Sequence, residues 1–273
     1  MKKKVILITG ASSGFGKDVA HELIKQGHVV YATARRVGLM KDLEALGGKV
    51  FKLDVTQQGD IDKVVSTLLD TEGRIDVLFN NAGFGAYGAI EAVSDEQIKY
   101  QFDVNLFGVS RMLKAVLPTM RKQKSGTIVN TASLVSHLST PIIGWYAATK
   151  HALKAVSDSL RLEVAHLGIN VVLIDPGAVK TGFEDVSVKA LEQINHPDDY
   201  KSLVSIVKKY ISKTYAQAPG PQSTTDCIVK AINSNNPSLR YKTTLDSKLL
   251  GFIKKVTPDV LVDKIISSQL KIK

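Results

Sequence analysis

The chain has 273 residues, 44% of them hydrophobic and 23% charged, a composition ordinary for a globular protein that buries a substantial core. Its single cysteine, Cys227, excludes an intrachain disulfide and fits a reducing compartment, and no apolar stretch approaches the roughly 20 residues that span a bilayer. The formal net charge is +10, but residues 1–200 hold 23 Lys and Arg against 22 Asp and Glu, which argues against nucleic-acid binding by the main body.

Short runs rich in Val, Ile and Leu alternate with helix-length amphipathic stretches. The basic start of the chain resembles the opening of a signal peptide, but its apolar run is too short and continues into Thr9-Gly10, which favours a buried strand over residues 5–9. The other expected strands are residues 29–33, 50–53, 77–80, 127–131, 171–174 and, near the end, 239–244. The expected helices include residues 18–26, 61–71, 95–117 and 147–166.

This alternation predicts an α/β fold with a doubly wound parallel sheet. No linker rich in Pro, Gly or Ser divides the chain, so we expect a single domain over residues 1–273, with a core of residues 1–185 and 237–244. Residues 183–236 fit the pattern poorly and are expected to form loops and helices appended to the carboxyl edge of the sheet, where a substrate would sit. Residues 245–273 would add a C-terminal helical extension.

A glycine-rich turn follows the first expected strand and opens a helix near Lys17. Glycines there permit a tight turn and close approach of the backbone to a pyrophosphate, and the helix N-terminus offers free N–H groups. The spacing is GxxxGxG rather than GxGxxG, so a purely structural turn is the alternative. The residues expected to bind a cofactor here are Gly10, Ser12, Ser13, Gly14, Phe15 and Gly16.

Two arginines, Arg35 and Arg36, follow the second expected strand. A site selective for NAD usually has Asp or Glu here, which accepts hydrogen bonds from ribose hydroxyls, and this stretch has no carboxylate. Guanidinium groups bind a 2′-phosphate with bidentate geometry. Together with the glycine-rich turn they predict NADP(H) as the cofactor, and a pair of solvated surface arginines is the alternative.

Tyr146 and Lys150 stand four residues apart in an expected helix and therefore on one face of it. Hydride transfer to a carbonyl builds negative charge on its oxygen, which needs a proton donor. A phenol is poorly matched to this role at its usual pKa of about 10, and a neighbouring ammonium lowers that pKa. Reaching neutral pH would take about 4 kcal/mol of differential stabilisation. Ser133 follows the strand 127–131 and would lie at the carboxyl edge, where its hydroxyl could bond the substrate oxygen.

In order and spacing, these motifs resemble the single-domain branch of the short-chain dehydrogenase/reductase family, which has a Rossmann-type fold with about seven parallel strands. The resemblance covers residues 5–185 and implies NADP(H)-dependent interconversion of a carbonyl and an alcohol. The stretches 31–36, 105–108 and 176–183 look most like the branch that handles retinoids and hydroxysteroids, which implies an apolar substrate. The resemblance rests on the GxxxGxG turn and on Asp54-Val55, Asn80-Asn81-Ala82-Gly83, Asn105, Ser133, Tyr146, Lys150, Pro176-Gly177 and Thr181.

The resemblance also implies a role for each matching residue. Tyr146 gives or takes the proton, Ser133 holds the substrate oxygen, and Lys150 also binds the nicotinamide ribose, while Asn105 supports a proton relay through water. The remaining cofactor contacts are Asp54 and Val55 at the adenine, Asn81, Ala82 and Gly83 in the cleft, and Pro176, Gly177, Val179 and Thr181 around the nicotinamide. Family members commonly pair through the long helices expected here at 95–117 and 147–166, which implies a homodimer or homotetramer.

Two other classes of function stay open. A regulatory protein that binds the cofactor without turnover would keep this fold, although the presence of both Tyr146 and Lys150 favours an enzyme. The second, that the chain binds nucleic acid, is supported by its net charge alone. The six histidines show no metal-ligand spacing such as HxH or HExxH, so no metal site is expected, and His137 is interpreted as a loop residue.

The C-terminal quarter carries the excess charge, because residues 201–273 hold 13 Lys and Arg against 4 Asp and Glu. Apolar residues recur there at helical spacing at Leu245, Leu249, Ile253 and Val256 and, after Thr257-Pro258, at Val262, Ile265, Ile266 and Leu270. Two basic amphipathic helices are therefore expected. They either pack on the body and close one side of the substrate pocket, or attach a cytoplasmic protein peripherally to the inner face of an anionic membrane.

Overall fold

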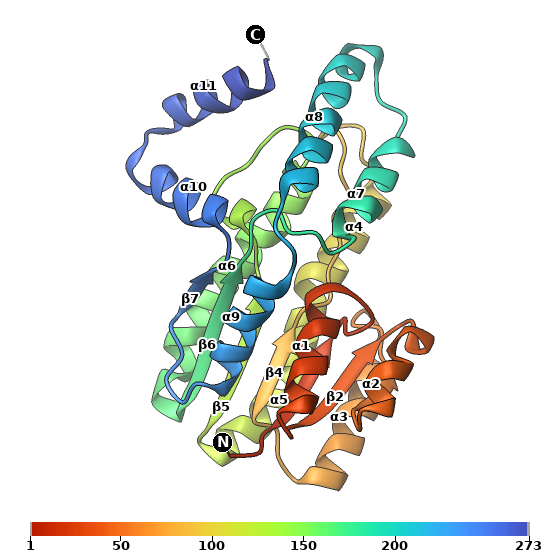
Figure 1. The fold of residues 1–273 in the computed structure, drawn as a ribbon, viewed down its shortest axis with the longest axis vertical. Coiled ribbons are helices and arrows are strands. Elements are labelled where there is room, and N and C mark those ends of the chain that lie inside the picture. Colours follow the sequence, from red (N-terminus) through yellow and green to blue (C-terminus); the bar gives the residue numbers. More distant parts are fainter. Residues whose placement is uncertain (1, 272–273) are drawn as a thin grey trace.

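The structure is a computed structural model that describes residues 2–271. Seven parallel strands form one sheet in the order β3-β2-β1-β4-β5-β6-β7, which confirms the predicted doubly wound fold (Figure 1). Each expected strand is present, with ends that differ by no more than two residues from the prediction. The strands are β1 (Val5–Thr9), β2 (Val29–Ala34), β3 (Lys49–Lys52), β4 (Val77–Asn80), β5 (Gly126–Thr131), β6 (Ile169–Asp175) and β7 (Arg240–Lys242).

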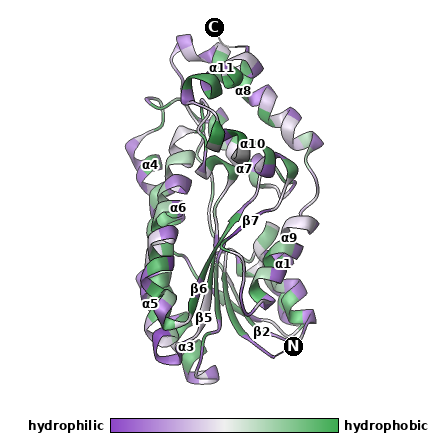
Figure 2. Ribbon diagram, turned by 90° about the vertical axis from the view of Figure 1, so that its left-hand side faces the viewer, coloured by the Kyte–Doolittle hydropathy of each residue, from purple (hydrophilic) through white to green (hydrophobic). Residues whose placement is uncertain are grey.

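Helices cover both faces of the sheet, and a hydrophobic core lies between the sheet and the helices on each face (Figure 2). Leu7 of β1 packs in one core, whereas Ile6 and Ile8 pack in the other, so every position of this strand is apolar. One core is covered by α3 (Gln58–Glu72), α5 (Gly108–Gln123) and α6 (Gly144–Val164), and the other by α1 (Gly14–Lys25), α2 (Lys41–Ala45) and α9 (Gln222–Asn233). Short 3₁₀ helices occupy Val37–Met40, Leu134–Ser136 and Ala165–Leu167.

Helix α9 differs from the prediction that residues 183–236 lie outside the core. It packs on the sheet beside α1, and its Ile228, Val229 and Ile232 are buried in the second core. The appended part is therefore α7 (Phe183–Glu192) and α8 (Asp198–Gln217), which stand beyond the carboxyl ends of the strands (Figure 1). Apolar residues have the same helical spacing in a helix that packs on the sheet and in a helix of an appended segment. The sequence alone therefore does not distinguish these two positions.

The helix expected over residues 95–117 is interrupted. Helix α4 (Asp95–Phe102) and helix α5 are joined by a π-helical segment, Asp103–Phe107, in which the Gly108 N–H donates to the Asp103 carbonyl. A π-helical turn inside a helix frequently marks a functional site. This one carries Asn105, whose side chain is buried.

The C-terminal tail forms the two predicted helices, α10 (Leu245–Val256) and α11 (Asp259–Leu270). Both lie at the carboxyl end of the sheet, on the same side of the molecule as α8 (Figure 1). Helix α10 begins with a capping box, in which Thr244 Oγ1 accepts from the Ser247 N–H (3.4 Å) and Ser247 Oγ accepts from the Thr244 N–H (3.3 Å). Across residues 2–271, no helix combines the length and the apolar character that a bilayer crossing requires.

Candidate active site

The glycine-rich turn lies at the carboxyl end of β1 and is locked against the loop after β4. Asn81 Nδ2 donates to the Gly10 carbonyl (3.1 Å), and the N–H groups of Asn81 and Ala82 donate to Thr9 Oγ1 (3.1 and 3.2 Å). Gly10 has a φ of +70°, and a Cβ there would lie 2.8 Å from the Ala82 Cα. A Cβ at Gly16 would lie 2.4 Å from the Gly10 carbonyl oxygen. Both positions therefore require glycine.

Helix α1 begins at Gly14 with an N-terminus that is open to an anion. Its N-cap residue, Ser13, makes no side-chain capping bond, and the first turn has no acidic residue. The free N–H groups and the positive end of the helix dipole suit a phosphate. Thr181, from a loop far along the chain, lies over this turn, since a Cβ at Gly14 would be 3.4 Å from the Thr181 Cβ. The turn and that loop thus lie next to each other at the expected cofactor site.

We expect Gly16→Ala to weaken binding of a nicotinamide dinucleotide by at least about tenfold. The new methyl group would displace the Gly10 carbonyl and the Asn81 amide, which lie within 2.5 Å of its position, and thereby the backbone that faces the pyrophosphate. Titration calorimetry with NADPH measures the change. Gly59→Ala is the control, because a Cβ at Gly59 meets nothing within 4 Å. Equal affinities for both variants would contradict a binding role for the turn.

The two arginines beyond β2 point to different neighbours. Arg36 Nη2 donates to Ser12 Oγ in the glycine-rich turn (3.5 Å), whereas Arg35 Nη1 donates to the Tyr100 hydroxyl on α4 (2.6 Å). Both guanidinium groups are exposed. Arg36 is therefore the one placed beside the turn, where a 2′-phosphate on the adenosine ribose would lie.

Asp54 and Val55 follow β3 and are engaged within the chain. Asp54 Oδ1 accepts from the Thr56 N–H (3.0 Å) and the Thr56 hydroxyl (2.8 Å). The Val55 side chain is buried where α5 approaches β3, so that a Cβ at Gly108 would lie 2.7 Å from Val55 Cγ2. These contacts fix the turn after β3, and the adenine contact expected of both residues stays a prediction.

Ser133, Tyr146 and Lys150 meet at the carboxyl edge of the sheet. Tyr146 and Lys150 face the same way on α6, with the Lys150 Nζ 5.8 Å from the centroid of the Tyr146 ring. Ser133, the N-cap residue of the short helix after β5, lies close enough to the Tyr146 hydroxyl to lower the pKa of the phenol. Lys150 Nζ donates to the Thr131 carbonyl (2.7 Å) at the end of β5. The predicted trio is thus brought together, with Tyr146 and Lys150 both buried.

Burial dominates the electrostatics of this pair. It raises the pKa of the Tyr146 phenol above its ordinary value, and the nearby Ser133 hydroxyl only partly offsets that increase. Burial also lowers the pKa of the Lys150 ammonium to about 8. The sequence predicts that Lys150, together with a positively charged nicotinamide, lowers the pKa of Tyr146. In the protein without a cofactor, loss of hydration outweighs the attraction of an ammonium that lies 5.8 Å from the ring centroid, so the lowering stays a prediction for the cofactor-bound site.

Asn105 is held from both sides within the π-helical segment. Its Oδ1 accepts from the Phe84 N–H (3.0 Å), and its Nδ2 donates to the Phe84 carbonyl (2.8 Å) and to Thr149 Oγ1 on α6 (3.1 Å). A Cβ at Gly83 would lie 3.1 Å from Asn105 Oδ1 and 3.7 Å from Lys150 Nζ. The absence of a side chain at Gly83 therefore leaves Asn105 and Lys150 facing the same small space.

The loop 176–181 is held by helix α10. The Gly177 N–H donates to Thr244 Oγ1 (2.9 Å), and the Ala178 N–H donates to Asp246 Oδ2 (3.1 Å). On its other side the Pro176 carbonyl accepts from the Leu134 N–H (2.8 Å), next to Ser133, and Val179 is buried. Sequence reasoning missed Thr244 and Asp246, because each contact spans more than 60 residues and follows no motif.

Aromatic residues outside the motifs surround the Tyr146 ring. Its centroid lies 5.8 Å from that of Tyr87 and 5.6 Å from that of Phe183. Tyr215 lies near enough for its phenol to raise the pKa of Tyr146 further, and burial raises the pKa of Tyr215 itself to about 12. We call the buried set the Tyr146 cluster, which consists of Tyr87, Ala89, Ile142, Tyr146, Leu191, Val207 and Leu270.

His137 is paired rather than free. Its Nε2 lies 2.9 Å from Asp175 Oδ2, at the buried end of β6, and Asp175 Oδ1 has no hydrogen-bond partner among the described residues. The pair ties the short helix after Ser133 to β6. The structure therefore gives His137 a structural contact beyond that of a plain loop residue.

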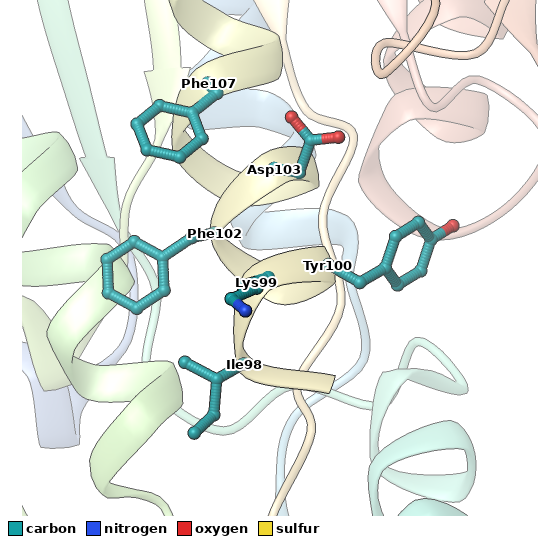
Figure 3. Close-up of a pocket in the computed structure, with 6 residues that line it drawn as sticks. All are labelled: Ile98, Lys99, Tyr100, Phe102, Asp103 and Phe107. Carbon is teal, nitrogen blue, oxygen red and sulfur yellow. The ribbon is translucent and has the colours of Figure 1, made fainter. Parts of the chain in front are cut away.

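A surface groove on α4 and the π-helical segment does not include Tyr146 (Figure 3). Phe102 and Phe107 project to one side of these helices, and Tyr100 projects to the other side, toward Arg35. The groove is separate from the catalytic candidates, because its lining includes none of Ser133, Tyr146 and Lys150. Its lining consists of Ile98, Lys99, Tyr100, Phe102, Asp103 and Phe107.

Residues 4–191, about two thirds of the chain, match the family model for short chain dehydrogenase. The chain belongs to the short-chain dehydrogenase family. Two relatives of this short-chain dehydrogenase extend the match. The 3-ketodihydrosphingosine reductase of Bacteroides thetaiotaomicron is 39% identical over 243 residues, covering 89% of this chain and 88% of the relative. Retinol dehydrogenase 8 of Homo sapiens is 32% identical over 268 residues, covering 93% of this chain and 85% of the relative.

Solved structures share the fold over nearly the whole length. A short-chain dehydrogenase from Streptomyces avermitilis has a TM-score of 0.84 and 32% identity and covers 98% of each chain. A family member from Burkholderia phymatum, solved with NAD, has a TM-score of 0.81 and 25% identity (96% and 95% covered). Serine dehydrogenase in its closed form, solved with NADP⁺, has a TM-score of 0.76 and 28% identity (87% and 93% covered).

The short-chain dehydrogenase described here is therefore an oxidoreductase with a Rossmann-type, nucleotide-binding fold. Its structural neighbours hold either NAD or NADP, so the fold alone does not choose between the two cofactors. Within residues 2–271, no group of three or more His, Cys, Asp or Glu side chains is placed to hold a metal ion.

Proposed function

We propose that this short-chain dehydrogenase uses NADP(H) to interconvert a carbonyl and an alcohol on an apolar substrate. The observation that carries the proposal is the position of the buried Tyr146, which lies close to Ser133, one helical turn from Lys150 and inside an apolar cluster. An acid, a polar anchor for the oxygen and a buried ammonium are the groups that this reaction needs.

The chain offers a matching site for the cofactor. The N-terminus of α1 and the backbone around Gly10 and Gly16 suit the pyrophosphate, and Arg36 beside Ser12 suits the 2′-phosphate. Lys150 and the loop 176–181 would hold the nicotinamide end. When bound, the cofactor supplies or accepts the hydride. Asn81 positions the glycine-rich turn through its bond to the Gly10 carbonyl.

The chain's own residues handle the proton and the substrate oxygen. Ser133 would donate a hydrogen bond to the carbonyl oxygen, and Tyr146 would give that oxygen its proton during reduction. Because burial raises the pKa of Tyr146, the phenol keeps its proton at neutral pH and is ready to act as the acid. Lys150, with a pKa of about 8, stays largely protonated and stabilises the phenolate that remains. Asn105 would hold the water through which the proton is replaced.

The Tyr146 cluster argues for an apolar substrate. Its aromatic and aliphatic side chains come from α6, α7, α8 and α11 and from the loops after β4 and before α6, so the residues packed around Tyr146 are largely apolar. The names of the relatives, a 3-ketodihydrosphingosine reductase and a retinol dehydrogenase, point to lipid-like substrates for those proteins. Reduction would prevail where NADPH is kept abundant.

The assembly that the family suggests fits the exposed apolar side chains of the long helices. Phe107, Val156 and Leu162 are exposed on the π-helical segment and α6, and the groove of Figure 3 lies on the same set of helices. We infer a homodimer or homotetramer that pairs through α4, α5 and α6, in the cytoplasm.

The proposal is tested by NADPH consumption with a panel of apolar ketones and aldehydes, with NADH as the control cofactor. We expect turnover with NADPH, and we expect Arg36→Asp to lower the NADPH/NADH ratio of kcat/KM by at least about 100-fold, since it replaces a charge-assisted partner by a like charge. Arg121→Asp, on the exposed end of α5, should leave the ratio unchanged.

Two results would count against the proposal. A ratio that Arg36→Asp leaves unchanged would overturn the choice of NADP(H). Tight NADPH binding without turnover on any compound of the panel would favour the regulatory protein that keeps the fold.

A further inference from the structure

Helix α10 turns its apolar stripe away from the body. Leu245, Leu249 and Val256 are 83%, 61% and 66% exposed, and their spacing of four and seven residues places them on one face. The opposite face holds the helix in place, because Ser247 is buried and Asp246 binds the loop 176–181. The exposed leucines are therefore not a frayed end but the outer face of an anchored helix.

Helix α11 is divided in the same way. Leu270 is buried in the Tyr146 cluster and Ile266 packs against it, whereas Val260, Leu261 and Ile265 are exposed on the other side. The helix thus has one apolar face toward the catalytic residues and another toward solvent. A monomeric protein rarely exposes so many large apolar side chains in one short segment unless they bind something.

Positive charge accompanies these apolar faces. Lys248 lies beside the α10 stripe, and Lys264 and Lys271 are exposed on and after α11. Residues 245–271, which include both helices, hold five Lys against three Asp; Asp246 is engaged with the loop 176–181 and Asp259 is paired with Lys254. The surface therefore combines hydrocarbon with cationic groups, the combination that suits the interface of an anionic bilayer.

We propose that the outer faces of α10 and α11 dock on the surface of an anionic lipid bilayer. The exposed leucine, valine and isoleucine side chains enter the boundary between headgroups and acyl chains, and the lysines bind anionic headgroups. Each helix has 12 residues, too few to span a bilayer, and its division into an outer and an inner face suits a position in the plane of the interface. If the proposed function holds, the buried face of α11 places the Tyr146 cluster next to the phase from which an apolar substrate comes.

A second copy of the chain is a poorer occupant of this surface. A two-fold contact would place the same patch on both partners and bring their lysines together. The charge that attracts an anionic bilayer would thus oppose that contact.

Co-sedimentation with vesicles of phosphatidylglycerol and phosphatidylcholine, compared with pure phosphatidylcholine, tests the proposal. We expect the wild type to pellet with the anionic vesicles and to be released by high salt. Leu245→Ser/Leu249→Ser should lower the partition coefficient by at least about tenfold, since two exposed leucines would no longer bury hydrocarbon. Lys248→Gln/Lys264→Gln should lower it only for anionic vesicles.

The matched control is Leu46→Ser/Leu239→Ser, which removes two exposed leucines from other parts of the surface and should leave binding unchanged. Equal recovery of wild type and the α10 variant, equal loss in both leucine pairs, or no pelleting of the wild type would overturn the proposal. A fall in mass by light scattering for the α10 variant without vesicles would instead assign the face to a second copy. NADPH affinity, measured in parallel, reports folding and separates a failure here from a failure of the proposed activity.

Discussion

Tyr146→Phe should lower kcat by at least about a thousandfold while changing NADPH affinity by no more than a few fold. The substitution removes one oxygen and keeps the ring that packs on Tyr87 and Phe183. General acid catalysis by a positioned side chain typically contributes about 10²- to 10⁴-fold, and here the same oxygen also lies close to Ser133. Steady-state NADPH consumption with the best substrate of the panel measures the loss.

Tyr210→Phe is the control for this experiment, because Tyr210 is an exposed tyrosine on α8 outside the Tyr146 cluster. It should retain wild-type turnover. If Tyr146→Phe kept more than about a tenth of the activity, the proton would have another source, and the assignment of Tyr146 would fail. Circular dichroism and NADPH titration would exclude unfolding as the cause of a loss.

Local motifs carried most of what the sequence could predict. The glycine-rich turn was recognisable because Gly10 has a positive φ and Gly16 has no room for a Cβ. Both requirements are met by glycine, so the turn is visible in the sequence. Tyr146 and Lys150 were recognisable because a helix places residues four apart on one face. The strands were recognisable because a parallel sheet covered on both faces needs continuous apolar runs such as β1.

The parts that the sequence could not predict depend on contacts between distant segments. Asp246 bonds to Ala178 across 68 residues, and Tyr87, Phe183 and Tyr215 meet Tyr146 from three separate elements. The direction of the Tyr146 pKa also depends on burial, which charge spacing along a helix does not reveal. The tail helices were predicted, but which of their faces turns outward was not.

Lys150→Met should abolish most activity and at the same time stabilise the protein at neutral pH. Burial lowers the pKa of Lys150 to about 8 from an ordinary value near 10.5, so holding the ammonium in the folded state costs about 3 kcal/mol. Methionine fills a similar volume without a charge but loses the bond to the Thr131 carbonyl, which is worth about 1 kcal/mol. The free energy of unfolding should therefore rise by about 2 kcal/mol at pH 7.

The pH dependence distinguishes this explanation from simple repacking. Between about pH 8 and 10.5 the unfolded wild type binds a proton that the folded wild type has released, so wild-type stability rises with pH and the advantage of Lys150→Met shrinks. Urea unfolding should give a difference of about 2 kcal/mol at pH 7 that approaches zero near pH 9.5. Lys63→Met, at an exposed position on α3, should show no such trend.

If Lys150→Met is less stable than the wild type, or if their difference in free energy of unfolding does not depend on pH, then burial of the Lys150 ammonium does not destabilise the folded protein. The expected result has a consequence for function. A buried lysine that lowers stability is expected where its charge serves the activity, and the group beside it is the Tyr146 phenol. If the variant loses turnover but gains stability at neutral pH, Lys150 serves catalysis and not folding, because removing a residue that the fold needs would lower stability.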